Sequence, residues 1–103
     1  MKKSKVFYTN ARALYYRYEY SLPAKYKALI EASEFAKYIP PQKRVAVKTH
    51  FGSQGSFRVV RPNFLRITVD AVKAATGVPF LTDTWSMGKL EIAARNGITE
   101  LSV

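Results

Sequence analysis

Two segments of the chain hold the residues best suited to binding a ligand or moving a proton. The set is His50, Gly52, Gly55, Arg58, Arg61 and Asp83. His50 is the single histidine, and an imidazole serves as a general acid, a general base or a metal ligand. Glycines let backbone N–H groups approach an oxyanion, and arginines supply positive charge to it. These residues predict a ligand- or anion-binding pocket and leave any catalytic residue unassigned.

Neither segment carries a recognised catalytic or nucleotide-binding motif. The loop at 52–56 matches neither GxGxxG nor GxxxxGK[ST], and no Ser-His-Asp order or paired carboxylates stand out. A structural interpretation therefore stays open beside the functional one. His50 can simply be exposed, Asp83 can cap a helix that begins near Ser86, and Arg58 and Arg61 can be solvated. Whether the chain is an enzyme is left undecided.

The hydrophobic pattern places both segments at the ends of predicted strands. Runs rich in β-branched and aromatic residues predict strands at 6–9, 45–51 and 78–82. Residues 57–60 either extend the preceding loop or add a short strand, and residues 98–103 form a fourth strand or a tail.

Three other segments repeat apolar residues every three or four positions, which predicts helices between the strands. They run from Ser21 to the Pro40 and Pro41 pair, from Arg61 to about Thr76, and from Ser86 to Asn96 and Gly97. Gly77 is predicted as the C′ residue of the second helix.

This alternation predicts an α/β fold, a three-layer, Rossmann-like βαβαβα segment with a small, mainly parallel sheet of three or four strands. Such a sheet is incomplete, because a parallel sheet usually has further strands at its edges and helices on both faces. The chain is therefore a single α/β domain over 1–103 or the N-terminal fragment of a larger one. Ligands bind at the carboxyl ends of parallel strands, which brings Arg12, His50 and Asp83 to one edge.

Composition and charge exclude several classes of protein and site. The 103 residues include 17 Lys and Arg against 7 Asp and Glu, for a net charge of +10, and no cysteine. The lack of cysteine excludes a disulfide scaffold, a zinc finger and a cysteine-ligated iron–sulfur cluster, so no cofactor and no metal site are predicted within this chain. No apolar run approaches the ~20 residues that span a bilayer, which predicts no membrane partner and a cytoplasmic location. The charge favours phosphate-bearing partners.

An aromatic segment at 11–20, predicted to be irregular, supports two alternative functions. It interleaves four tyrosines with Arg12 and Arg17, a composition typical of single-stranded nucleic-acid surfaces. The same aromatics suit packing against another domain or subunit. A basic nucleic-acid-binding module is therefore the second hypothesis. A structural domain that forms a homo-oligomer through an exposed edge strand is the third.

Several blocks of the sequence resemble a known family. They are KVFYTNAR at 5–12, VAVKTHFG at 45–52, RP at 61–62 with VDAVK at 69–73, PFLTDT at 79–84 and AARNG at 93–97. Together they resemble the N-terminal part of the uncharacterised iron–sulfur-centre proteins grouped as domain of unknown function 362, over nearly the whole chain. The strongest blocks are the two strand ends that hold His50 and Asp83.

The resemblance implies a redox or cofactor-handling role only for longer proteins. Members of that family are typically much longer, and many carry ferredoxin-like cysteine clusters toward the C-terminus. This chain lacks those cysteines and is short after Thr84, so an iron–sulfur cluster would need a longer parent protein. What the resemblance implies here is a functional role for His50, Gly52, Asp83 and Arg61.

Overall fold

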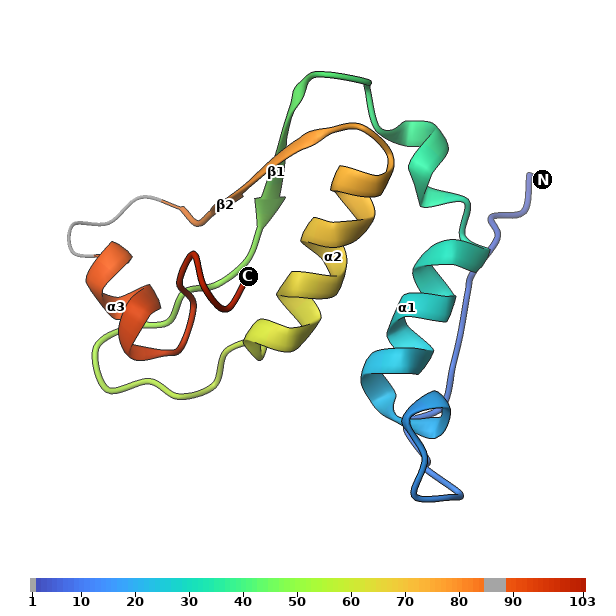
Figure 1. The fold of residues 1–103 in the computed structure, drawn as a ribbon, viewed down its shortest axis with the longest axis horizontal. Helices are drawn as coiled ribbons and strands as arrows, with labels where there is room; N and C mark the ends of the chain where they lie inside the picture. The colour runs from blue at the N-terminus through green and yellow to red at the C-terminus, as the bar shows by residue number, and fades with distance from the viewer. Residues whose placement is uncertain (1, 85–88) are drawn as a thin grey trace.

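Helices and parallel strands alternate along the chain. The computed structural model describes residues 2–84 and 89–103. Its elements are the 3-10 turn η1 (Tyr18–Tyr20), α1 (Leu22–Ala32), the 3-10 turn η2 (Phe35–Tyr38), β1 (Arg44–Lys48), α2 (Pro62–Ala74), β2 (Val78–Thr82) and α3 (Lys89–Arg95). β1, α2 and β2 form a βαβ unit, and α2 lies between the sheet and α1 (Figure 1). The predicted α/β class with a small parallel sheet is confirmed.

The sheet of the described residues has two strands in parallel register. Arg44 pairs with Val78 and Lys48 pairs with Thr82. β2 has the predicted bounds. β1 ends three residues earlier than predicted, although Thr49 N still donates to Thr82 O at 2.9 Å.

The helices cover one face of this sheet. Proline at the start of α2 is pre-organised for a helix, and apolar residues three or four apart then form its buried stripe. Leu65 from this stripe packs with Phe51, Ala93 and Ile98, and Leu81 of β2 packs against that cluster. No described helix covers the opposite face, so the layer predicted there is missing from the described part. The radius of gyration is 15.4 Å, against about 13 Å for a compact domain of this size.

The C-terminal end of α2 differs from the prediction by one residue. Thr76 N donates to Lys73 O at 2.9 Å and Gly77 N donates to Val72 O at 3.0 Å, the Schellman pattern in which Thr76 is C′ and Gly77 is C″. Thr76 takes the left-handed conformation with a φ of 66°. Gly77 is required for another reason, since a Cβ there would lie 2.7 Å from Ile39 Cγ2.

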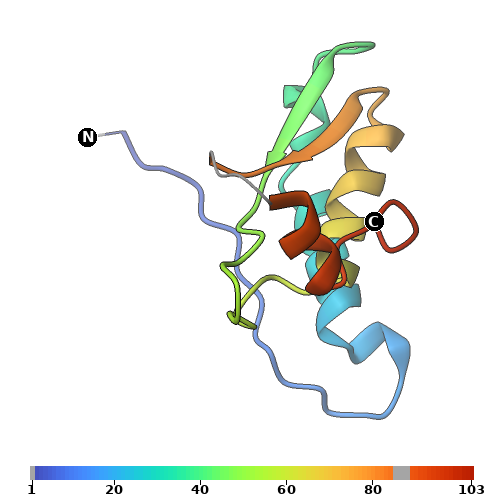
Figure 2. The same ribbon diagram turned by 90° about the vertical axis from the view of Figure 1, so that its left-hand side faces the viewer.

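The predicted strand at 6–9 is wrong for this structure. Residues 2–14, here called the N-terminal strap, contain no strand and run outside the body of the molecule (Figure 2). Lys25 Nζ donates to Asn10 Oδ1 at 2.9 Å and also to the Arg12 carbonyl. These polar contacts hold the strap on α1 in this structure.

The first predicted helix is shorter than expected. Ser21 caps it, with Oγ accepting from Ala24 N at 3.3 Å. The helix ends at Ala32, and the hydroxyl of Ser33, its C-cap residue, donates to Ile30 O at 2.6 Å. Glu34 then takes a left-handed φ of 55°, which separates α1 from η2. Local hydrogen bonding by serine competes with the helical ladder in this way.

The last two segments complete the comparison with the sequence. Asn96 and Gly97 end α3 as predicted, and Gly97 has a φ of +83°. Residues 98–103 form a turn, so the tail is correct and the fourth strand is not. Residues 57–60 are loop. Ser86 and Met87, predicted for the start of the last helix, lie outside the described residues.

Candidate functional site

Polar residues follow both strands at the point where each strand ends. β1 ends at Lys48 and β2 at Thr82, and these two residues are partners in the register. Because the strands are parallel, the residues that come next meet at one edge of the sheet. His50 and Asp83 are therefore brought together, as the sequence predicted.

The Asp83 carboxylate lies at the centre of this edge. Its side chain is only 1% exposed. Oδ1 accepts from Lys48 Nζ at 2.8 Å and from Thr84 N at 2.7 Å, and Oδ2 accepts from Phe51 N at 3.1 Å. A buried carboxylate is costly unless it is paired and hydrogen-bonded. Asp83 is satisfied by these groups, and it fixes them in turn.

His50 lies beside the same carboxylate. Its Nδ1 is 3.5 Å from Asp83 Oδ2, and its side chain is 56% exposed. This distance is longer than an ordinary N–H···O hydrogen bond, so the carboxylate contacts the ring only loosely. Most of the imidazole faces solvent. An exposed imidazole beside a carboxylate is suited to binding a polar ligand or exchanging a proton.

Gly52 is buried behind His50, and glycine is required there on two grounds. Its φ is +93°, and a Cβ would lie 2.6 Å from Asn96 Nδ2 and 3.1 Å from Val59 Cγ1. Asn96 Nδ2 donates to Phe51 O at 2.8 Å. The Asn96 amide therefore holds the segment that carries His50.

Asn96 and Lys48 are the residues that the predicted set lacked. Asn96 has a local role at the end of α3, and its contact with Phe51 spans 45 positions, so no local pattern reveals it. The sequence places Lys48 with Arg12, Arg58 and Arg61 among the basic residues expected at this edge, but it does not predict the bond from Lys48 to Asp83. Thr84 joins the site through its backbone N–H.

Gly55, Arg58 and Arg61 lie in the loop between β1 and α2, and all three are exposed. Gly55 has a φ of +82° and open space around it. Neither guanidinium forms a hydrogen bond or ion pair with another described residue. The structure therefore does not bring these three residues into contact with His50 or Asp83.

The segment that includes β1 and the loop after it is rich in basic residues. Residues 43–69 include six Lys and Arg and no Asp or Glu. Of these, Lys43 and Arg44 lie at the opposite end of β1, Arg66 pairs with Asp70, and Lys48 pairs with Asp83. Arg58 and Arg61 are exposed in the loop after β1.

The sequence has no cysteine to ligate an iron–sulfur cluster. Within 2–84 and 89–103, no three His, Asp or Glu side chains come together to hold a metal ion. In the same part of the chain, no helix combines the length and apolar character that crossing a bilayer requires.

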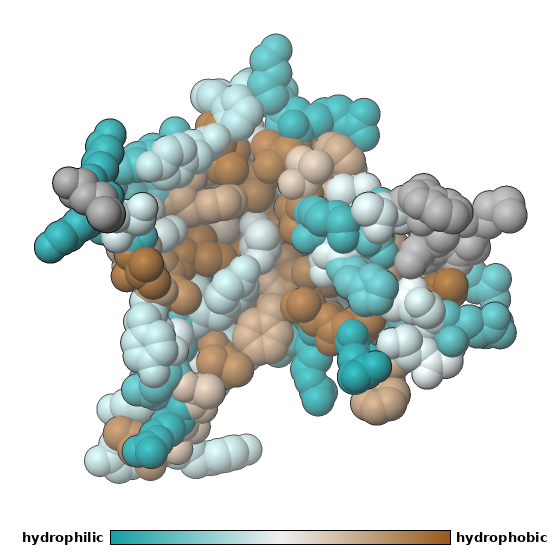
Figure 3. Space-filling view, turned by 180° about the vertical axis from the view of Figure 1, so that it is seen from behind, coloured by the Kyte–Doolittle hydropathy of each residue, from teal (hydrophilic) through white to brown (hydrophobic). Residues whose placement is uncertain are grey.

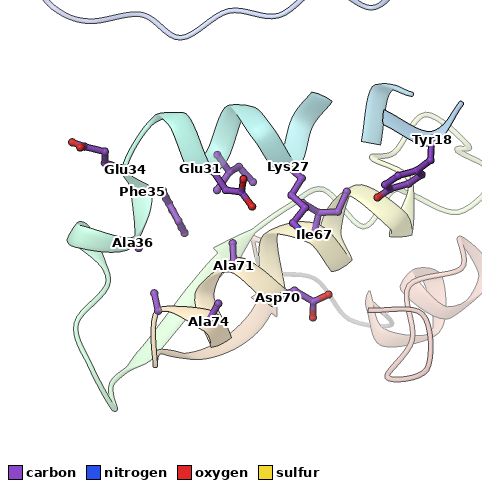
Figure 4. Close-up of a pocket in the computed structure, with 12 residues that line it drawn as sticks. Tyr18, Lys27, Glu31, Glu34, Phe35, Ala36, Ile67, Asp70, Ala71 and Ala74 are labelled. Atoms are coloured by element: carbon purple, nitrogen blue, oxygen red, sulfur yellow. The ribbon is translucent and has the colours of Figure 1, made fainter. Parts of the chain in front are cut away.

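A separate cavity lies away from this edge, between α1, η2 and α2. It has a volume of about 470 Å³, and Glu31, Asp70 and Ala71 are among the residues around it (Figure 4). None of the six predicted residues lines it. The predicted site and this cavity are separate features.

Comparisons with known proteins place the chain in a family. No curated protein and no solved structure matches it. The family described as "Domain of unknown function (DUF362)" matches residues 45–103, more than half of the chain. The match runs from β1 to the C-terminus and includes all six predicted site residues. The chain therefore belongs to the DUF362 family.

Proposed function

We propose that the carboxyl edge of the sheet binds a phosphate-bearing small molecule, with His50 and Lys48 as its contacts. The observation that carries this proposal is the buried Asp83 carboxylate, which holds the Lys48 ammonium at 2.8 Å and lies 3.5 Å from the His50 ring. Both partner side chains are more than half exposed. A ligand can therefore reach them without disturbing Asp83.

The charge at this edge favours an anion over a cation. The Asp83 carboxylate is enclosed by donors and presents little surface to solvent. What faces solvent is an ammonium and an imidazole, followed along the chain by the exposed Arg58 and Arg61. Phosphate oxygens accept hydrogen bonds from all these groups. The loop glycine Gly55 leaves room for a ligand beside the backbone.

The single histidine gives a direct test. Its ring protons produce resolved NMR signals that no other residue can contribute, so phosphate and pyrophosphate can be titrated against the uniformly labelled chain at constant ionic strength. We expect a saturable shift of the His50 ring signals and of the Phe51 amide. A shift equal to that caused by sodium chloride would disprove the site.

Two variants make this test specific. Lys48→Met removes a charged donor but keeps the stem, and it should weaken phosphate binding about tenfold, the loss of a charge-assisted hydrogen bond. Asp83→Asn should also weaken it, since both contacts lose their common anchor. Lys37→Met is the matched control, because Lys37 lies on η2 and pairs with Glu34. Unchanged binding by both site variants would contradict the proposal.

A second candidate function is binding of single-stranded nucleic acid, which we propose for the aromatic segment. Tyr15, Tyr16 and Tyr18 are exposed beside Arg12 and Arg17, and exposed rings with basic neighbours stack on bases. Fluorescence anisotropy with a labelled oligonucleotide tests this. We expect binding that weakens steeply with salt and is reduced by Tyr16→Ala. Absence of binding at low salt would remove this candidate.

A further inference from the structure

The two edges of the sheet differ in their capacity to accept another strand. Thr49 N–H and Lys43 C=O bond to β2, so by alternation the backbone groups of Ala46 point away from β2, toward the free edge of β1. At the other edge the outward positions of β2 are Pro79 and Leu81, and Pro79 has no N–H to donate. The β1 edge is therefore the less obstructed edge for another strand.

An apolar hollow lies directly beside this edge. It has a volume of about 380 Å³ between α1, β1 and the start of α2, with Tyr26, Val47 and Phe64 among its lining residues. Figure 3 shows apolar side chains gathered in a hollow on the face seen from behind. A strand added to β1 would turn alternate side chains into the space under α1.

The N-terminal strap holds a segment with the composition of such a strand. Residues 6–9 read Val-Phe-Tyr-Thr, all of them β-branched or aromatic. Val6 is 86% exposed and Tyr8 is 82% exposed, so the segment gains burial wherever it docks. The segment is followed by Asn10, which accepts a hydrogen bond from Lys25. Lys25 is next in sequence to Tyr26, which lines the hollow.

Connection rules point to the same edge. β1 connects to β2 through α2, and parallel crossovers are right-handed in nearly all proteins. α1 packs beside α2, through the Tyr26 hydroxyl at 2.7 Å from Thr68 Oγ1. A strand at 6–9 that leads through α1 into β1 with the same hand must lie on the side of β1 away from β2.

We propose that residues 6–9 close onto the free edge of β1 as a third, parallel strand within the same chain. The strap then has two states: closed, with residues 6–9 paired to β1, and open, with the strap lying on α1 as described above. Closure buries the two exposed side chains and covers the unpaired edge. It also sends Asn10 and Arg12 out of the carboxyl end of the new strand, beside Lys48 and His50. This last step rests on the proposed phosphate site, whereas the strand pairing does not.

Amide hydrogen exchange tests the pairing without reference to any ligand. We expect the Ala46 amide to exchange at least about tenfold more slowly in the native chain than an exposed amide of the same sequence context. Exchange at the exposed rate would overturn the proposal. Sedimentation at the same concentrations shows whether the chain is a monomer or a dimer. If the Ala46 amide is protected only in a dimer, the added strand comes from a second copy, and pairing within the chain is overturned.

Proline substitutions give the pairing its signature. Alternate residues of a strand point their N–H groups toward the neighbour, and an edge strand tolerates proline where the N–H faces outward. Of Phe7→Pro and Tyr8→Pro, one should therefore restore fast exchange at Ala46 and the other should not. Lys3→Pro, in the strap but outside the segment, is the control and should leave exchange slow. Equal effects of the two variants, in either direction, would contradict a strand.

A final variant separates the two proposals. Arg12→Ala should leave the Ala46 amide protected and weaken phosphate binding about tenfold. If phosphate does not bind the native chain but Ala46 is protected, the phosphate site is wrong and the third strand is correct. If phosphate binds but Arg12→Ala has no effect and Ala46 exchanges fast, the strand is wrong and the site is correct.

Discussion

The part of the chain matched by the family and the part before it are built differently. Every described residue that is buried lies between 49 and 98, and none lies in 2–43. Residues 45–103 supply the core around Phe51 and Leu65 and the Lys48, Phe51 and Thr84 groups that bond Asp83. Residues 2–43 attach to this unit through partly exposed contacts. The difference shows that the core and the candidate site are properties of the same segment.

Contacts of several kinds join the two parts, among them the backbone hydrogen bonds from Gln42 N to Thr76 O at 2.9 Å and from Val78 N to Lys43 O at 2.8 Å. Tyr26 supplies two others, through its hydroxyl on Thr68 and its ring edge against Phe64 at 5.8 Å between centroids. Ile39 supplies another, by packing over Gly77. Because none of the described residues in 2–43 is buried, we expect the N-terminal part to open at a lower cost than the rest.

The largest expected effect tests where the core lies. Leu65→Ala removes a buried side chain from the central cluster and should lower the free energy of unfolding by about 3 kcal/mol. Leu22→Ala, at the exposed start of α1, should cost about 0.5 kcal/mol or less. Urea denaturation measures both. Similar losses for the two variants would show that the parts share one core.

The second effect tests the support beneath the candidate site with a matched pair of glycines. Gly52 and Gly55 both have positive φ, but only Gly52 is crowded, by Asn96 and Val59. Gly55→Ala should cost about 1 kcal/mol from backbone strain alone. Gly52→Ala should cost about 2 to 3 kcal/mol, because a Cβ also displaces the Asn96 amide. If urea denaturation gives the same loss of unfolding free energy for both variants, the Asn96 side chain moves aside without an energetic penalty.

Sequence reasoning succeeds where local pattern and tertiary burial agree. The strand at 78–82 is wholly as predicted, and α2 starts at its proline and buries Leu65 and Val72 as expected, together with Val69. The meeting of His50 with Asp83 follows from parallel topology alone, since both residues come after strand ends. These features lie in the family-matched part, where the core enforces the local preference.

The failures lie where tertiary context decides. The segment at 6–9 has strand propensity but is held on α1 by Lys25, and propensity does not reveal that contact. Ser33 and Glu34 interrupt a run whose apolar period continues to Ile39. Asn96 contacts Phe51 across 45 positions, and no local pattern in the sequence indicates a contact between residues so far apart.

A smaller effect tests the joint between the two parts. Tyr26→Phe removes the hydroxyl that bonds Thr68 Oγ1 at 2.7 Å and keeps the ring against Phe64. It should lower stability by about 1 kcal/mol and speed amide exchange in α1 more than in α2. Tyr16→Phe, at an exposed position, is the control and should change neither. Uniform acceleration across both helices would indicate that the parts open together.

The smallest effect concerns an ion pair on the surface of the N-terminal part. Lys37 Nζ donates to Glu34 Oε2 at 2.8 Å, and this hydrogen bond, with the charge of Lys37, lowers the pKa of Glu34 from its ordinary value of 4.5. The unfolded chain therefore takes up this proton first as the pH falls. The pair stabilises the fold above pH 4.5, and its contribution is lost as the pH drops through the lower pKa of the folded state. Because both groups are exposed, the effect is small and salt screens it.

Melting temperatures of the native chain and of Glu34→Gln test this. At low salt they should converge once the pH falls below the lowered pKa of Glu34, and at high salt they should not differ. If Glu34→Gln melts at the native temperature even at neutral pH and low salt, the pair adds nothing to the stability of the fold.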